Sequence, residues 1–227
     1  MINFDDRVAI VTGAGAGLGR SHALALAERG ARVVVNDLGG NVDGTGGSSA
    51  AAGAVVAEIE AAGGRAIANG ANVSDLDQVH AMVAEVTDRW GRVDILVNNA
   101  GILRDRSFQK MDLADFRTVI DVHLMGSVYC TKAVWDLMRE QNYGRIVMTS
   151  SSSGLWGNFG QANYSAAKMA LIGLMSTLAI EGMKYNIRVN ALAPAATTRM
   201  TEALFPTEAL ERFAPGAVSP GLLALVH

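Results

Sequence analysis

The stretch Thr12–Ser21, TGAGAGLGRS, follows the apolar run VAIV and contains four glycines at alternate positions. The common dinucleotide-binding pattern G-x-G-x-x-G does not fit it, because the third glycine would fall on Leu18 or Arg20. The pattern that does fit is T-G-x-x-x-G-x-G. Its fixed positions are Thr12, Gly13, Gly17 and Gly19.

A glycine turn between a strand and a helix is a site for an anion. Free backbone N–H groups and the positive end of the helix point to one place, and glycines let a phosphate approach without meeting a Cβ. A turn that merely needs flexible residues is the alternative. Because the turn follows the first strand of a βα repeat, we interpret it as a pyrophosphate site formed by Gly13, Gly17, Leu18 and Gly19.

Short β-branched runs alternate with alanine- and leucine-rich stretches along the chain. This pattern favours a parallel sheet covered on both faces, so residues 1–227 are predicted as a single doubly wound α/β domain with three layers. Ligands of such sheets bind beyond the carboxyl ends of the strands. The expected strands are Val8–Val11, Arg32–Asn36, Arg65–Ala68, Val93–Val97, Arg145–Thr149 and Arg188–Leu192. The expected helices are Leu18–Arg29, Ser49–Ala62, Asp112–Glu140, Asn163–Met183 and one that is capped by Ser74 and ends at Trp90.

Composition excludes several classes of function. The net charge is −3 with no basic run, which argues against a nucleic-acid or membrane partner. Cys130 is the only cysteine, which excludes an internal disulfide, and the four histidines lack the spacing of metal ligands. There is no signal-peptide pattern, no apolar run near the roughly 20 residues that span a bilayer, and no S-K-L ending. We therefore expect a metal-free cytoplasmic protein.

Asp37 ends the second predicted strand, where a carboxylate takes the adenosine ribose of a dinucleotide. A carboxylate accepts hydrogen bonds from a 2′,3′-diol and repels a 2′-phosphate, so NAD is favoured over NADP. A simple turn role for Asp37, or an effect of the nearby cation Arg20, is the alternative. The stretch Leu38–Ala50 that follows is a long glycine-rich connection, which we interpret as a flexible surface excursion.

The segment QANYSAAK places Tyr164 and Lys168 on one face of a predicted helix. A free tyrosine has a pKa of about 10, and lowering it to about 7 for proton transfer takes roughly 4 kcal/mol of preference for the phenolate. A lysine ammonium one turn away supplies much of that, although such a pair is also common on helix surfaces. Ser151, at the end of a predicted strand, favours the chemical interpretation because its hydroxyl can polarise a substrate oxygen.

The glycine pattern, the NNAG of Asn98–Gly101, Ser151 and the Tyr164/Lys168 pair together resemble the short-chain dehydrogenases/reductases. The resemblance implies a seven-stranded Rossmann fold and hydride transfer between a nicotinamide and a hydroxyl/carbonyl pair. It implies Tyr164 as the acid/base, Ser151 as the donor to the substrate oxygen, and Lys168 as the residue that holds the nicotinamide ribose and lowers the tyrosine pKa. Both Tyr164 and Lys168 would thus also contact the cofactor.

The resemblance extends from about Arg7 to Met200 and implies further cofactor contacts. Two positions depart from the family pattern. His123 stands where an asparagine commonly holds a water of the proton relay, and Ala195 replaces the glycine of a P-G pair. The implied cofactor contacts are Asn72, Val73, Asn99 and Thr197.

The stretches NDLGG, NNAGILRDRSF and GNFGQANYSAAK are similar to the (3R)-hydroxyacyl-CoA dehydrogenase modules of peroxisomal multifunctional β-oxidation proteins. This implies NAD-dependent oxidation of (3R)-3-hydroxyacyl-CoA, a small-molecule acyl thioester, to 3-oxoacyl-CoA. A 3-oxoacyl-carrier-protein reductase or another short-chain alcohol dehydrogenase is the alternative. A protein that senses NAD without turnover is less favoured, because both the tyrosine and the lysine are present.

The chain stops at Leu223–His227, within an apolar helical pattern. The resemblance implies a seventh strand after this point, so we expect that strand to be missing or truncated. The apolar stretch Met169–Ile180 is hydrophobic nearly all round, as a helix buried between subunits would be. A homodimer or homotetramer is therefore predicted, with burial inside one subunit as the alternative.

Overall fold

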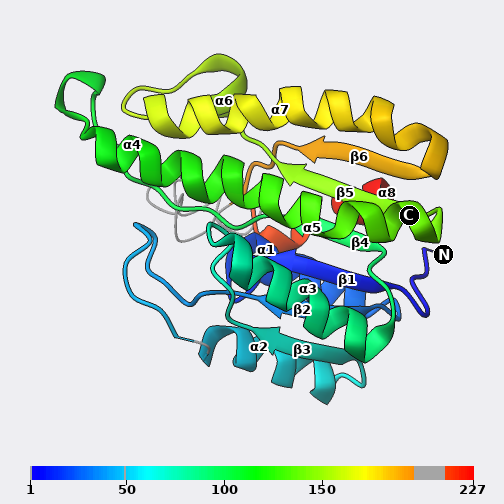
Figure 1. Ribbon diagram of the computed structural model, residues 1–227. Helices are drawn as coiled ribbons and strands as arrows, with labels where there is room; N and C mark the ends of the chain where they lie inside the picture. Colours follow the sequence, from blue (N-terminus) through cyan, green and yellow to red (C-terminus); the bar gives the residue numbers. More distant parts are fainter. Residues whose placement is uncertain (1, 49, 197–212) are drawn as a thin grey trace.

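Six parallel strands form one sheet in the order β3-β2-β1-β4-β5-β6. In this computed structural model, which describes residues 2–48, 50–196 and 213–227, the strands lie side by side from β3 at one edge to β6 at the other (Figure 1). The strand order reverses between β1 and β4, and at such a point a crevice opens beyond the carboxyl ends. The strands are β1 (Val8–Thr12), β2 (Arg32–Asn36), β3 (Arg65–Asn69), β4 (Ile95–Asn98), β5 (Gly144–Thr149) and β6 (Ile187–Leu192).

Helices cover both faces of the sheet, which confirms the doubly wound α/β fold. The seventh strand that the family resemblance implies is not among the described residues. A π-helical turn, η2 (Asp121–Met125), joins two helices where one continuous helix was predicted. The helices are α1 (Gly17–Ala27), α2 (Ala50–Ala61), α3 (Leu76–Trp90), α4 (Leu113–Ile120), α5 (Gly126–Gln141), α6 (Ser152–Trp156), α7 (Ala162–Gly182) and α8 (Ser219–Val226).

The central residues of β1 to β5 are apolar because each face of the sheet has its own hydrophobic core. Successive side chains of a strand point to opposite faces, so neighbours in the sequence enter different cores. In β1, Ala9 and Val11 pack with α1, α2 and α8, whereas Val8 and Ile10 pack with α3, α5 and α7. This double burial fixes the register of the sheet, since a one-residue slip would exchange the two faces.

The cap of α3 differs from the prediction. Asp75 rather than Ser74 is the N-cap, and its carboxylate accepts hydrogen bonds from the backbone N–H groups of Asp77 and Gln78. Ser74 instead donates its hydroxyl to the side-chain oxygen of Asn72, 2.8 Å away. Both residues are good caps, and the preceding Asn72 turn decides between them by occupying the serine.

Helix α7 is long and apolar enough to cross a membrane, judged by length and composition alone, and is the one such helix in the described part of the chain. It packs against β6, α4 and α6, in the helical layer that covers one face of the sheet. Met169 and Ile180 on its outer side are exposed. Burial inside the subunit therefore accounts for only part of its apolar sequence.

Helices α1 and α8 are joined by a buried polar contact. His22 has an exposure of only 1%, and its Nδ1 atom lies 2.9 Å from the hydroxyl oxygen of Ser219. The Ser21 hydroxyl lies 2.8 Å from that same Ser219 oxygen. Burial lowers the pKa of His22 to about 4. The imidazole is therefore neutral in the folded protein over the physiological range.

This contact predicts acid sensitivity of the fold. Above pH 6.5 the imidazole is neutral in both states, whereas below it the unfolded chain binds a proton and the folded protein does not until about pH 4. The free energy of unfolding should fall over that window, and the share from His22 is about 3 kcal/mol. Urea unfolding across the window should show a smaller decline for His22→Gln than for the wild type. The matched control His80→Gln, at an exposed position of α3, should leave the decline unchanged; equal slopes for all three proteins would contradict the assignment.

Candidate active site

Thr12 and Asn99 lock the turn after β1 to the turn after β4. The Thr12 hydroxyl accepts hydrogen bonds from the backbone N–H groups of Asn99 and Ala100, both at 3.0 Å, and donates to the Val97 carbonyl at 3.3 Å. In return, the Asn99 amide donates to the carbonyls of Thr12 and Gly13, at 2.9 and 3.1 Å. The hydroxyl therefore uses its whole donor and acceptor capacity on this joint.

The glycines of the turn are required by geometry. Gly13 and Gly17 have φ angles of 64° and 54°, which other residues rarely adopt. A Cβ on Gly19 would lie 2.2 Å from the Gly13 carbonyl oxygen, and one on Gly15 would lie 2.8 Å from the Asp37 carboxylate. The sequence pattern missed Gly15, because its constraint comes from a residue on another strand.

Helix α1 begins without a side-chain cap and without an acidic residue in its first turn. Its first N–H groups therefore have no partner within the helix, and Gly17 and Leu18 line a pocket there. An uncapped helix end beside a glycine turn fits the pyrophosphate of a dinucleotide. Gly19 does not line this pocket, and its role is to let α1 pack onto the turn.

Asp37 lies at the end of β2 and touches the same turn. Its two carboxylate oxygens accept the N–H groups of Gly15 at 2.7 Å and Gly39 at 2.6 Å. Each oxygen retains a further lone pair, so the carboxylate can also accept ribose hydroxyls. Arg20 is paired with Glu58 on the surface and does not line the pocket.

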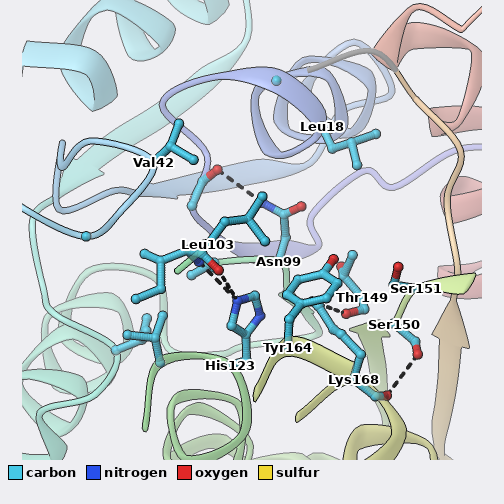
Figure 2. A pocket seen from close by; sticks show the side chains of 18 of the residues that line it. Leu18, Val42, Asn99, Leu103, His123, Thr149, Ser150, Ser151, Tyr164 and Lys168 are labelled. Atoms are coloured by element: carbon cyan, nitrogen blue, oxygen red, sulfur yellow. Dashed lines mark hydrogen bonds between the residues drawn. The ribbon is translucent and has the colours of Figure 1, made fainter. Parts of the chain in front are cut away.

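Tyr164 and Lys168 enter the pocket from α7, and Ser151 enters it from the end of β5 (Figure 2). The Lys168 ammonium nitrogen donates to the Thr149 carbonyl at 2.5 Å and lies 5.5 Å from the centre of the Tyr164 ring. Ser151 and Tyr164 line the pocket together, and the Ser151 hydroxyl is close enough to lower the pKa of the tyrosine. Ser150 turns away and donates to the Lys168 carbonyl, so Ser151 is the serine of this run that faces the tyrosine.

Burial dominates the electrostatics of these groups. It raises the pKa of Tyr164 above its usual value, the Ser151 hydrogen bond opposes this, and the charge of Asp105 adds to it. It also lowers the pKa of Lys168 to about 7. A tyrosine pKa near neutrality, as the sequence predicted, therefore does not arise from the lysine and serine alone in this structure.

His123 lies on the π-helical turn and is buried, with 3% exposure. Its Nε2 atom lies 3.0 Å from the Ile102 nitrogen and 2.8 Å from the Ile102 oxygen, while its Nδ1 atom is buried without a hydrogen-bond partner among the described residues. Its ring meets the Tyr164 ring edge-on at 5.2 Å. Burial, reinforced by the charge of Lys168, lowers its pKa to about 3, so it is a neutral residue that braces the NNAG turn.

Apart from Thr12, Gly15 and Gly19, the predicted groups among the described residues line one pocket of about 720 Å³ at the carboxyl ends of the strands. The glycine-rich stretch that follows Asp37 lies on the surface, as predicted, and its residues Leu38, Gly40, Asn41, Val42 and Gly44 also line the pocket. Thr197 lies outside the described residues, and no group of three potential metal ligands occurs in the described part of the chain. The predicted residues that line the pocket are Gly13, Gly17, Leu18, Asp37, Asn72, Val73, Asn99, Ser151, Tyr164 and Lys168.

Comparison with known proteins agrees with this arrangement. The family model described as short chain dehydrogenase matches residues 7–209. The chain belongs to the short-chain dehydrogenase family. It is an oxidoreductase, and the family acts on small-molecule substrates.

Two curated relatives extend the comparison. This short-chain dehydrogenase is 54% identical to the peroxisomal multifunctional enzyme type 2 of Mus musculus over 226 residues, all of this chain but only 30% of the mouse protein. It is 49% identical to a 3-oxoacyl-[acyl-carrier-protein] reductase of Synechocystis over 199 residues, 87% of this chain and 77% of that protein.

A solved structure points to the cofactor class. The 7α-hydroxysteroid dehydrogenase complexed with NADH and 7-oxo glycochenodeoxycholic acid superposes with a TM-score of 0.88 and 29% identity, covering 99% of this chain and 89% of that one. Together with the family, this neighbour implies a nicotinamide cofactor for this short-chain dehydrogenase.

The surroundings of two helical glycines, Gly19 and Gly53, predict that replacement by alanine has opposite effects on the free energy of unfolding. Gly19→Ala forces a methyl group against the Gly13 carbonyl, and we expect a loss of about 1–3 kcal/mol in unfolding free energy. Gly53→Ala in α2 meets nothing within 4 Å and should stabilise the protein by about 0.5–1 kcal/mol. Denaturant titration of both variants measures the difference. A Gly19→Ala protein as stable as the wild type would show that the turn tolerates a Cβ.

Proposed function

We propose that the protein is an NAD-dependent dehydrogenase that interconverts a secondary alcohol and a ketone, with (3R)-3-hydroxyacyl-CoA as the substrate and 3-oxoacyl-CoA as the product. One observation carries the proposal: the side chains of Ser151, Tyr164 and the buried Lys168 line one pocket, which also contains the open end of α1.

In this mechanism Tyr164 is the acid/base and Ser151 holds the substrate oxygen. During oxidation the substrate hydroxyl gives its proton to the phenolate form of Tyr164, which becomes the neutral phenol, and the Ser151 hydroxyl orients the substrate hydroxyl by hydrogen bonding. A bound oxidised nicotinamide would supply the hydride acceptor for the carbinol carbon and a positive charge near the phenol. Lys168 contributes a cation in the same desolvated space, where charge interactions are stronger than in water.

The acyl-CoA substrate is supported by the multifunctional relatives and by the residue stretches that resemble their dehydrogenase modules. The chain spans less than a third of the mouse relative, so the other activities of that protein are not proposed for it. Three stretches of the pocket wall, NDLGG, NNAGIL and GNFGQANYSAAK, carry the similarity.

The second candidate is a 3-oxoacyl-carrier-protein reductase, which the Synechocystis relative favours. Cofactor choice discriminates between the two, because the Asp37 carboxylate faces the pocket and Arg20 is occupied by Glu58. Efficient turnover with NADPH would favour the reductase. A protein that binds NAD without turnover is the third and least supported candidate.

The proposal of a homo-oligomer is supported by exposed apolar residues on the outer side of α7 and at Met183 directly after it. Met169, Ile180 and Met183 are each at least half exposed, at 50%, 73% and 74%. Covering this apolar surface with a second copy supports a homodimer or homotetramer. A cytoplasmic location stays a prediction from the sequence, whereas the mouse relative is peroxisomal.

The mechanism predicts that Tyr164→Phe removes nearly all turnover and leaves the affinity for NAD almost unchanged. The variant keeps the ring that packs edge-on against His123 and loses only the oxygen that carries the proton. Steady-state assays of NADH formation together with calorimetric titration of NAD measure the two effects. A rate like that of the wild type would refute the assignment of the base.

Cofactor choice gives a separate prediction for Asp37→Ala. Removing the carboxylate should weaken NAD much more than NADP, because the bonds to a ribose diol are lost while the repulsion of a 2′-phosphate is relieved. The Gly15 and Gly39 N–H groups also lose their acceptor, so some loss with both cofactors is expected. Titration with each cofactor provides the ratio, and equal losses would mean that Asp37 only holds the turn.

A further inference from the structure

The segment Gly101–Arg106 after β4, here called the β4 strap, contacts the glycine-rich loop Leu38–Ala50. The Leu103 N–H donates to the Val42 carbonyl at 2.9 Å, and Arg104 Nε donates to the Asp43 carbonyl at 2.9 Å. The Arg104 guanidinium also pairs with Asp115 of α4 at 2.7 Å. One side chain thus connects the loop to a helix on the other side of the strap.

The loop has little else to hold it in place. It contains five glycines, and ordering such a chain is costly in conformational entropy. Its other hydrogen bonds among the described residues are local, such as Asn41 N–H to Thr45 O at 2.8 Å and Ser48 N–H to Leu38 O at 2.9 Å. Apart from the bond of the Gly39 N–H to Asp37, the two bonds to the β4 strap are the only hydrogen bonds that join the described residues 38–48 to residues outside the loop.

The same loop forms part of the pocket wall. Gly40, Asn41, Val42 and Gly44 line the pocket, and the loop begins directly after Asp37. It therefore lies at the end of the pocket where the proposed adenosine side of the cofactor belongs.

Arg104 also reaches the helix of the proposed catalytic tyrosine. Its carbonyl accepts the side-chain amide of Asn163 at 3.0 Å, and Asn163 is fully buried. The Asn163 oxygen accepts the Tyr164 backbone N–H at 2.7 Å. The backbone of Arg104 is thus fixed by α7, which leaves its side chain free to hold the loop.

We propose that Arg104 is a positioning residue that holds the glycine-rich loop against the cofactor end of the pocket, and that the affinity for NAD depends on this hold. The proposal rests on the proposed function for its ligand. The planar guanidinium suits the task because it donates at once to the Asp43 carbonyl and the Asp115 carboxylate. A lysine ammonium keeps the charge but not this forked geometry.

The first test compares Arg104→Ala with the matched control Arg106→Ala. Arg106 lies on the same β4 strap, is exposed, and contacts Gly160 only through its backbone N–H among the described hydrogen bonds. If the loop is in its binding position for a smaller fraction of the time, the apparent affinity for NAD falls in proportion to that fraction. We expect the dissociation constant for NAD to rise about tenfold in Arg104→Ala, or about 1.4 kcal/mol, with kcat at saturating NAD within about twofold. Arg106→Ala should bind like the wild type, and equal affinity of both variants overturns the proposal.

Arg104→Lys separates position from charge. If the loop must be held, this variant should bind NAD nearly as weakly as Arg104→Ala. If Arg104 acts only as a cation near the phosphates, the lysine should restore wild-type affinity, and that result overturns the proposal.

Hydrogen exchange of the free protein tests the hold without any ligand. The amides of Asn41, Gly44 and Thr45 donate within the loop and exchange only when it opens. Arg104→Ala should speed their exchange several-fold, and Arg106→Ala should not. Failure of the wild type to bind NAD or NADP would overturn the proposed function while leaving this result standing. Unchanged exchange in Arg104→Ala overturns the role of Arg104 whatever the cofactor.

Discussion

The hydroxyl of Thr12 is the constraint on which the site depends. Its hydrogen bonds to Val97, Asn99 and Ala100 join the ends of β1 and β4, the two strands between which the sheet order reverses. Together with the bonds of the Asn99 amide to the Thr12 and Gly13 carbonyls, this joint ties the glycine turn to the NNAG turn. These hydrogen bonds fix the position of the open end of α1 relative to the NNAG turn and the β4 strap that follows it.

A second constraint is the burial of Lys168. Its ammonium has one carbonyl partner and no carboxylate in the described part of the chain, and a buried cation without a counter-ion is costly. The pKa of about 7 reflects that cost. A group kept under such strain for packing alone would be easily replaced by an apolar residue, so its presence in the pocket argues for a role in binding or chemistry.

The sequence predicted what depends on local pattern and missed what depends on contacts between distant segments. The strands were predicted to within one or two residues because the central residues of β1 to β5 are apolar on both faces. Gly15 was missed because Asp37, on another strand, makes it necessary, and Ser74 was preferred to Asp75 because the competing turn of Asn72 leaves no pattern. The contribution of the glycine-rich loop to the pocket was not predicted for the same reason: its composition indicates flexibility, and its contact with Arg104 comes from a distant segment.

His123 shows how one unusual residue fits into this frame. A neutral imidazole nitrogen either donates or accepts, so Nε2 satisfies the Ile102 carbonyl or the Ile102 N–H, but not both at once. An asparagine amide could serve both groups. The histidine ring instead fills the space beside Gly101, where a Cβ would lie 2.2 Å from its Cε1 atom, and packs its edge against Tyr164. Packing of the His123 ring thus takes the place of the second hydrogen bond that an asparagine could make. Gly101, the glycine of NNAG, leaves the space that the ring occupies.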